Sequence, residues 1–495
     1  MASALKRSFK KADTETSKKS KIENDSAQII VPLTPKQLRR AEKARKREAL
    51  KKELLPEYCK EMMPKRISYY VKDGIRFLNP YWSVFGAYAK GRWIGRELNE
   101  VFTTEFLSHN RYYAKAAIRR GRLFVNGKQM TNPEYQIRTS DRIVHLGHRH
   151  EHPILVKPEI RVIADTDRFF VVDKPPSMPV HACGQYRVHS VLGLLKTVYK
   201  IDGLKVCHRL DRTTSGVLIF AKDYGTDITF KDEILNKTLC KEYICKVDGI
   251  FPEGELVCEA PIDVLSVMMG IQYVSETGKS SLSRFRRLTV NETENTSLVL
   301  CNIETGRTHQ IRVHLQYLGY PIHGDYFYND EVWGPEKGKG AAYGKSIEQL
   351  KDDVHNKHKS SIWIEEQDPQ YEKRLLEICE NELQEPDEIK LNQLRLDNLP
   401  IYDELCLGCN VRKRIPSIDM FRIHLHCWRY RGADWQFEAP LPDWASELRR
   451  AADETEVQTK PLIISESQEA SNEIEIPPEF ASTQLIEECQ KLAAV

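Results

Sequence analysis

The sequence has no long apolar run. Nothing in it approaches the roughly 18 residues that a membrane-spanning helix needs. The longest candidates, such as GVLIFA at 216–221, have the length of buried strands. No apolar stretch follows the first basic residues, as it would in a secretory signal. We therefore expect a chain with no membrane partner.

The sequence also lacks a disulfide framework. Its twelve cysteines are scattered without regular spacing, which is typical of reduced thiols in a cytosolic or nuclear protein. Asp13 and Glu15 argue against a mitochondrial presequence, because such presequences contain few acidic residues. Lysine clusters before residue 22 could serve as a nuclear signal. We expect a cytoplasmic location, a nuclear location, or both.

The net charge of +3 conceals an uneven distribution. Residues 1–60 hold 17 Lys+Arg and 8 Asp+Glu, a net +9, whereas residues 446–495 hold 4 and 11, a net −7. A basic arm suits a polyanion, because neutralising phosphates releases counterions. It equally suits a solvated tail, and both interpretations stay open.

The chain of 495 residues is long enough for more than one domain. From about residue 160 short β-rich runs dominate, which predicts an α+β domain on an antiparallel or mixed sheet. The expected order is a disordered basic arm with a helix (1–60), a small RNA-binding domain (61–150), a catalytic domain (151–345), a polar insertion with amphipathic pieces (346–400), the end of the catalytic domain (401–445) and a loose acidic tail (446–495).

The small domain has a recognisable pattern. Residues 112–121 predict a helix ended by Gly121, and residues 122–128 predict a strand entering an Asn126-Gly127 hairpin turn. This order resembles the S4 RNA-binding fold. The resemblance places basic side chains along one edge, where they could bind phosphates: Lys115, Arg119, Arg120, Arg122 and Lys128. The alternative is a small fold with incidental surface charge.

The segment CHRLDRTTSG at 207–216 places a carboxylate between two arginines. Arg209 and Arg212 should keep Asp211 ionised, lowering its pKa by ~1–3 units if they are close. An ionised carboxylate beside a sugar can attack a glycosidic carbon. The alternative is a structural Asp–Arg pair without catalysis.

Two later segments add polar groups. In the strand predicted at 241–247, Lys241 and Tyr243 share one face, so the tyrosine can stack under a base. In TGRTHQIRVHL at 305–315, a helix is predicted from 308 to 318 with Gly319 as its stop. His309, Arg312 and Gln316 then form one stripe. A strand tyrosine is more often a core residue, and a polar stripe is more often solvated.

Together these three segments resemble the motifs of the RluA family of pseudouridine synthases, His-Arg-Leu-Asp-x-x-Thr-Ser-Gly, Lys-x-Tyr and Gly-Arg-Thr-His-Gln-Ile-Arg-x-His, in the family's order. Residues 172–181 (VDKPPSMPVH) resemble the segment that opens the catalytic domain, and 437–442 (FEAPLP) resembles its closing segment. The likeness covers residues 160–330 and 420–444.

The resemblance implies a cofactor-free isomerase that turns uridine in RNA into pseudouridine. Asp211 would attack the ribose or promote elimination, Tyr243 would stack on the base and take part in proton transfer, and Arg312 would pair with Asp211. Arg209 would fill the space left by the flipped base. The expected substrate-binding residues are Arg209, Arg212, Lys241, Arg307, His309 and Gln310, of which Arg307 and Gln310 suit hydrogen bonds to phosphates or base edges.

The resemblance to relatives with a basic arm and a polar insertion suggests a transfer RNA substrate, with the anticodon loop as an expected position and messenger RNA as a further expected substrate. We also expect a monomeric enzyme. One alternative is a catalytically silent RNA-binding protein on the same fold. A free-nucleoside glycosidase is disfavoured, because a small substrate needs neither the basic arm nor an RNA-binding domain.

One half of a zinc site is present in Cys406-Leu407-Gly408-Cys409. Two of His424, His426 and Cys427 could complete a tetrahedral site. His426, however, belongs to the closing segment, and no second Cys-x-x-Cys exists. We therefore expect neither a metal nor a cofactor.

Overall fold

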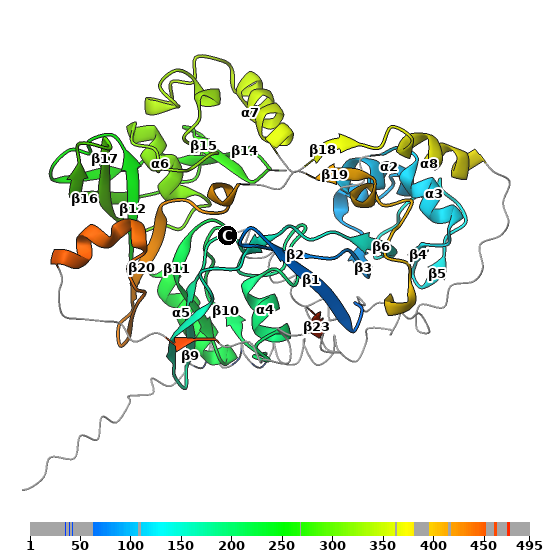
Figure 1. Ribbon diagram of the computed structural model, residues 1–495, viewed down its shortest axis with the longest axis horizontal. Helices are drawn as coiled ribbons and strands as arrows, with labels where there is room; N and C mark the ends of the chain where they lie inside the picture. Colours follow the sequence, from blue (N-terminus) through cyan, green and yellow to red (C-terminus); the bar gives the residue numbers. More distant parts are fainter. Residues whose placement is uncertain are drawn as a thin grey trace, which may run out of the picture.

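The computed structural model describes residues 63–106, 110–267, 269–361, 364–380, 396–413, 417–451, 460–462 and 473–475, with isolated positions at 35, 39 and 42. The basic arm expected at 1–60 lies outside these described residues, except for the three isolated positions. Figure 1 shows a larger lobe on the left and a smaller lobe on the right.

The larger lobe is built on an eleven-stranded sheet. Because it holds the residues expected to form the catalytic domain, it is called here the catalytic lobe. Its order is β13-β16-β17-β12-β20-β11-β9-β8-β22, with β10 beside β11 and β21 beside β20. β11 and β20 run parallel and the other pairs are antiparallel, so the predicted α+β class on a mixed sheet is confirmed. The strands are β8 Arg161–Asp165, β9 Phe169–Lys174, β10 Lys205–Val206, β11 Ser215–Ala221, β12 Cys240–Asp248, β13 Glu255–Cys258, β16 Ser283–Asn291, β17 Thr296–Ile303, β20 Leu425–Arg431, β21 Gln436–Glu438 and β22 Lys460–Pro461.

The core of this lobe is formed where β9 and β11 pair. Every residue of β11 after Ser215 is buried, as expected for an apolar run at the centre of a sheet. Helices α4 (Val191–Thr197) and α5 (Tyr224–Leu235) begin at Ser190 and Asp223, whose side chains accept from the backbone N–H of Gly193 and Thr226. These caps satisfy donors that the first helical turn leaves unpaired.

The smaller lobe holds a four-stranded sheet in the order β3-β6-β4-β5. Its elements are β3 Tyr81–Tyr88, α2 Leu98–Glu105, α3 Tyr113–Arg119, β4 Leu123–Val125, β5 Lys128–Gln129 and β6 Arg142–Arg149. As the sequence predicts, Gly121 follows α3 with a φ of 67°, and Asn126 and Gly127 join β4 to β5 with φ values of 51° and 80°. The assignment of this lobe to the S4 fold stays a prediction.

The insertion has more structure than its polar composition indicates. Helix α7 (Ile347–Ser361) packs Leu350 and Val354 against Trp333 in the catalytic lobe. β18 (Ile364–Gln367) and β19 (Val411–Lys413) form a pair, and Figure 1 places this pair between the two lobes. Helix α8 (Tyr371–Glu380) packs on the small lobe.

Two further findings revise the expected organisation. Residues 401–413 were expected with the end of the catalytic domain, yet Leu405 is buried in the core of the small lobe, so from here on the insertion is taken as residues 346–413. The tail after Trp444 was expected to be loose. Its residues Glu473–Glu475 form β23, which pairs with β1 (Arg66–Lys72). The side chain of Ile474 packs into the apolar core and is 2% exposed, which holds this strand in place.

The remaining strands complete the smaller sheets. β1 continues through β2 (Ile75–Leu78) to β7 (Ile154–Leu155), while β14 (Ile262–Ser266) and β15 (Ile271–Val274) form a pair beneath α7. Among the residues that the structure describes, no helix has the length and apolar character needed to cross a membrane.

Gly216 allows β11 to approach β20. It lies opposite Cys427 in the parallel pair, and a Cβ placed on Gly216 would lie 2.1 Å from the Cys427 carbonyl oxygen. Its φ of 109° also excludes most side chains. The contact between these strands therefore requires glycine.

Replacing Gly216 with alanine should lower the free energy of unfolding by about 3 kcal/mol or more, because strain in φ adds to a backbone clash. Gly203→Ala is the matched control. Gly203 has a φ of 79° but no atom within 4 Å of the added Cβ, so about 1 kcal/mol is expected. Urea denaturation of both variants measures the difference, and equal losses would contradict the steric role.

Candidate active site

Asp211 lies on the loop between β10 and β11, and a buried lysine holds this loop in place. The Lys174 ammonium donates to the carbonyl oxygens of Pro175, Arg212 and Thr214 at 2.9, 3.2 and 2.7 Å. Lys174 is fully buried at the end of β9. Burial lowers its pKa to about 7, and the charge of Asp211 opposes this effect.

The backbone turns sharply before α6 (Gln310–Leu318). His309 has a left-handed conformation, with φ 56° and ψ 19°, so the helix starts two residues later than the sequence predicts. This turn brings His309 Nε2 to 3.8 Å from Asp211 Oδ2. A non-glycine residue in this conformation stores strain, which is common at functional sites.

The proton of His309 can be assigned from its neighbours. The Tyr328 hydroxyl accepts from the backbone N–H of Gln272 at 3.0 Å and lies 2.7 Å from His309 Nδ1. The hydroxyl can therefore donate to Nδ1, which leaves the imidazole proton on Nε2, facing Asp211. Burial, followed by the charge of Arg312, lowers the pKa of His309 to about 4, so the ring is neutral at pH 7.

Arg312 connects two carboxylates. Its Nε and Nη2 donate to the two oxygens of Asp325 at 2.6 and 2.8 Å, and its Nη1 lies 3.8 Å from Asp211 Oδ2. Burial would lower the pKa of Arg312, but the carboxylate of Asp325 raises it above its ordinary value. The guanidinium is thus charged, and Asp325 fixes its plane. Sequence reasoning did not identify Asp325, because it lies outside the three segments.

Asp211 is ionised at neutral pH. Burial alone would raise its pKa, yet the pKa is lowered because His309, Arg312 and Arg209 act in the opposite direction. Since the imidazole is neutral at pH 7, the arginines supply the positive charge. The Asp211 side chain keeps 21% of its surface exposed, so a substrate can reach the carboxylate.

Tyr243 lies on β12 opposite Cys427 of β20 and Cys301 of β17. Burial is the main reason why the pKa of Tyr243 lies well above its ordinary value. The neighbouring Cys427 raises this pKa further, and so does the charge of Asp211. The phenol is therefore protonated. The structure brings Tyr243, Asp211, His309 and Arg312 into one site from three places in the fold: β12, the loop between β10 and β11, and the start of α6.

Four other residues predicted to bind the substrate differ in their exposure and their contacts. Arg209 is exposed, and Arg212 Nη2 donates to the Tyr326 hydroxyl at 3.2 Å. Lys241 is buried, with its pKa lowered by burial. Arg307 Nε donates to the Ser280 carbonyl at 3.1 Å.

Gln310 was expected to contact RNA, but in the structure its side-chain amide forms hydrogen bonds within the protein. Its oxygen accepts from the Thr305 hydroxyl at 2.8 Å and from the Arg307 backbone at 3.0 Å. Its nitrogen donates to the Leu282 carbonyl and the Ser283 hydroxyl at 3.0 and 2.8 Å. Both donors and both acceptors of the amide are thus used within the protein.

The five basic residues of the small lobe that were predicted to bind RNA divide into two sets. Lys115 and Lys128 are exposed and Arg119 is half-buried. Arg120 pairs with Glu404 at 2.7 Å, and Arg122 pairs with the buried Asp403 at 2.7 Å. Arg120 and Arg122 therefore bind the insertion in this structure, which leaves the first set facing outward.

Comparisons with known proteins show which family the chain resembles. Residues 168–317 match the family model described as RNA pseudouridylate synthase. The chain is 36% identical over 416 residues to pseudouridylate synthase RPUSD2 of Mus musculus, covering 77% of this chain and 73% of that protein. It is 36% identical over 301 residues to the mitochondrial tRNA pseudouridine(32) synthase of Saccharomyces cerevisiae, covering 59% and 64%. The tRNA pseudouridine(31) synthase of the same yeast is 26% identical over 422 residues, covering 77% and 98%.

The yeast relative corrects the location expected from composition. An enzyme 36% identical to this chain is named as mitochondrial. Scattered cysteines and a few acidic residues near the first methionine therefore do not restrict this chain to the cytoplasm or the nucleus. The distribution of cysteines and acidic residues describes the composition of the chain and does not by itself identify the compartment in which the protein acts.

Replacing Asp325 with asparagine should destabilise the protein by about 3–5 kcal/mol, because it leaves the buried Arg312 guanidinium without its charged partner. The control is Arg284→Gln, which removes exposed pairs with Glu255 and Glu304 and should cost about 1 kcal/mol or less. Denaturant titration compares the two. A loss at Asp325 as small as that at Arg284 would contradict the supporting role of this pair.

Proposed function

This chain belongs to the RNA pseudouridylate synthase family and is an RNA pseudouridine synthase, and from this premise we propose that it isomerises particular uridines of transfer RNA. The observation that carries the proposed mechanism is the ionised Asp211, partly exposed beside Arg312 and His309. Messenger RNA is a further proposed substrate, and the enzyme is proposed to act as a monomer.

The proposed reaction needs no cofactor. Asp211 attacks the ribose anomeric carbon, or promotes elimination, and the bond from that carbon to uracil N1 breaks. The freed base rotates and its C5 bonds to the anomeric carbon. On the attack route the bond between Asp211 and that carbon breaks at this point and restores the carboxylate; on the elimination route the proton removed from C2′ is returned. The proton lost from C5 is balanced by one gained at N1. Arg312 orients the carboxylate, while Tyr243 stacks on the base and takes part in proton transfer. His309, whose imidazole proton faces Asp211, joins Arg312 in orienting it.

The target nucleotide must leave its stack before Asp211 can reach the sugar. Extrusion costs a few kcal/mol and is least costly in a loop. Arg209, exposed two residues before Asp211, is assigned the space that the base leaves. Two relatives carry tRNA positions 32 and 31 in their names, which supports a uridine in or beside the anticodon loop.

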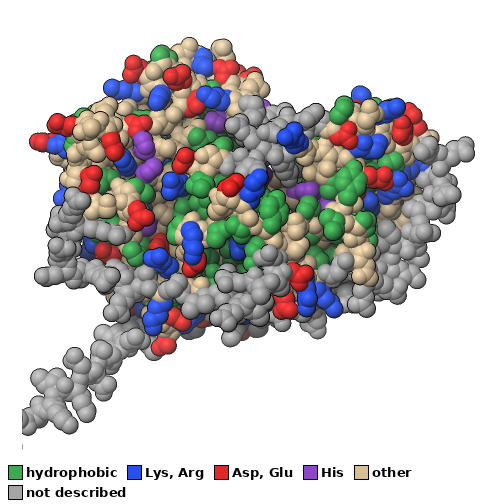
Figure 2. Space-filling view, in the orientation of Figure 1, with side chains coloured by type: hydrophobic (Ala, Val, Ile, Leu, Met, Phe, Trp, Pro, Cys, Tyr) green, Lys and Arg blue, Asp and Glu red, His purple; other side chains and the backbone are tan. Residues whose placement is uncertain are grey.

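The surface supports an RNA partner. In Figure 2 hydrophobic side chains gather across the middle of this face, with Lys and Arg among and around them. Apolar surface suits bases and cations suit phosphates. We assign the S4-like lobe a role in RNA binding through its outward-facing cations, Lys115, Arg119 and Lys128.

The alternative is a silent RNA-binding protein on the same fold. Such a protein would not require an ionised aspartate in contact with an arginine whose plane a second carboxylate fixes. The Arg312–Asp325 pair costs desolvation, and it contributes nothing to phosphate binding because both charges are buried. The site therefore favours catalysis.

Asp211→Asn should abolish pseudouridine formation while RNA affinity changes by no more than a few fold, because the carboxylate acts in the chemical step. Asp263→Asn, a change of the same type outside the site, is the control and should retain activity. Purified proteins are assayed on tRNA transcripts, with binding measured in parallel. Turnover by pure Asp211→Asn protein would show that another group attacks the sugar.

Pseudouridine mapping in cells with and without the protein tests the substrate. Sites in tRNA should disappear without it and return with the wild-type chain but not with Asp211→Asn. Sites lost only from messenger or ribosomal RNA would overturn the tRNA assignment without affecting the enzyme class.

Deleting residues 1–60 should weaken RNA binding and flatten its salt dependence, with a slope change of about 0.7 per lost phosphate contact for single strands. The double variant Lys115→Glu/Lys128→Glu should act in the same direction, and Lys237→Glu on the catalytic lobe should not. Turnover at saturating RNA should change little. Equal slopes for the deletion and the full chain would make the arm a sorting or solubility element instead.

A further inference from the structure

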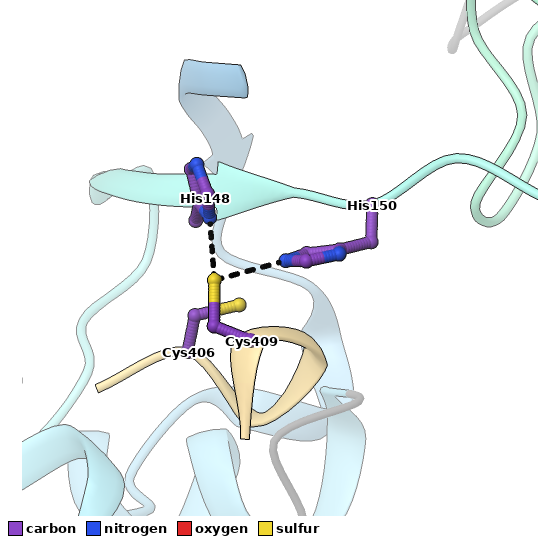
Figure 3. A group of neighbouring side chains, drawn as sticks. All are labelled: His148, His150, Cys406 and Cys409. Atoms are coloured by element: carbon purple, nitrogen blue, oxygen red, sulfur yellow. Dashed lines mark hydrogen bonds between the residues drawn. The ribbon is translucent and has the colours of Figure 1, made fainter. Parts of the chain in front are cut away.

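Two cysteines and two histidines converge on the small lobe, away from the Asp211 site. They are His148, His150, Cys406 and Cys409, and their ligand atoms lie within 4.8 Å of one another. Figure 3 shows both imidazoles directed at the Cys409 sulfur, with the Cys406 sulfur beside it. The distances are 3.1 Å from His148 Nδ1 and 3.3 Å from His150 Nε2 to Cys409 Sγ.

We propose that these four residues bind a structural zinc ion that joins the insertion to the small lobe. Thiolate sulfur and imidazole nitrogen are the ligands zinc prefers, and two of each form a common tetrahedral set. With Zn–S of about 2.3 Å and Zn–N of about 2.0–2.1 Å, neighbouring ligand atoms would lie roughly 3.3–3.8 Å apart. Small side-chain rotations bring the present arrangement to that geometry.

The local backbone explains the convergence. His148 lies on β6 and His150 follows two residues later, so both side chains leave the same face of the strand. Cys406 caps and Cys409 ends a single 3-10 turn, Leu407–Cys409, in which positions three apart lie above one another. Each pair therefore presents two ligands on one side.

The turn is built to receive an imidazole. A Cβ on Gly408 would lie 2.5 Å from His150 Cδ2, so only glycine allows the ring this close. Asn410 fixes the turn, because its side-chain amide donates to the Cys406 carbonyl at 2.8 Å. The neighbouring Asp403 is anchored by Arg122 at 2.7 Å.

The proposal departs from the sequence-based expectation that no metal is bound, and it uses other partners than those considered for the half-site. His424 and His426 belong to the catalytic lobe, where His424 Nδ1 contacts the His323 carbonyl at 2.9 Å and His426 Nδ1 contacts the Ser215 hydroxyl at 2.8 Å. Cys427 faces Tyr243. The ligands that complete the site lie far earlier in the chain.

Four protein ligands leave no position for water or substrate, so the zinc would be structural. The ion would fix Cys409 just before β19 (Val411–Lys413), from which the chain returns to β20 and the active site. Oxygen-preferring cations such as magnesium do not suit this ligand set.

The test uses the untagged full-length chain, purified without chelator. Elemental analysis should find about one zinc per chain. Cobalt(II), substituted for zinc, should give the charge-transfer absorption of thiolate ligation and the visible bands of a tetrahedral ion. Cys409→Ser and His150→Ala should each lower zinc affinity roughly tenfold or more. Cys379→Ser, in the same lobe but hydrogen-bonded to the Tyr112 carbonyl, should retain the metal.

Three results would overturn the proposal, and the first two do not depend on how the variants fold. One is a wild-type chain that holds no zinc and binds no added zinc or cobalt. Another is a disulfide between Cys406 and Cys409, detected as a mass loss under non-reducing conditions. The third is full zinc content in a Cys406→Ser/Cys409→Ser double variant.

Discussion

The parallel contact between β11 and β20 is the constraint on which the active site depends. Asp211 precedes β11 by a few residues, and Cys427 of β20 faces Tyr243 of β12. If β20 stood further from β11, the tyrosine and the aspartate would separate. Gly216 makes the approach possible, because any side chain there would meet the β20 backbone.

Electrostatic balance determines the chemistry of the site. A partly buried carboxylate is disfavoured by desolvation, while one unit charge about 4 Å away contributes roughly 4 kcal/mol at an effective dielectric constant of 20. Arg312 supplies this charge at 3.8 Å from Asp211. Asp325 prevents the guanidinium from closing fully onto Asp211, since it holds two of its three nitrogens. The Asp211 carboxylate is thus ionised without being held in a tight ion pair, as the proposed attack on the sugar requires.

The sequence predicts those parts of the site that neighbouring residues determine. The β11 run, the helix ending at Gly319, the Asn126-Gly127 turn and the cluster of ionisable groups around Asp211 follow from local patterns. Asp325 could not be found in this way, because only the folded chain brings it to Arg312. Gln310 is the opposite case. It lies in a motif and was predicted to bind RNA, but its polar groups only form hydrogen bonds that stabilise the fold. The start of α6 was also missed, because a left-handed histidine leaves no local signal.

The same distinction explains the cysteine–histidine cluster. From the Cys-x-x-Cys turn alone, the nearest downstream histidines are the expected further metal ligands. These histidines, however, lie beside and on β20 in the catalytic lobe. The insertion instead crosses to the small lobe, where α8 and Leu405 pack beside α3, and this crossing brings the turn to β6. Arg122–Asp403, Arg120–Glu404 and the cluster then lie along one contact between the insertion and the small lobe. Since β19 follows that contact in the chain and precedes β20, the lobe proposed to bind RNA and the strand that faces Tyr243 are connected through a part of the insertion that two ion pairs and the cysteine–histidine cluster hold on the small lobe.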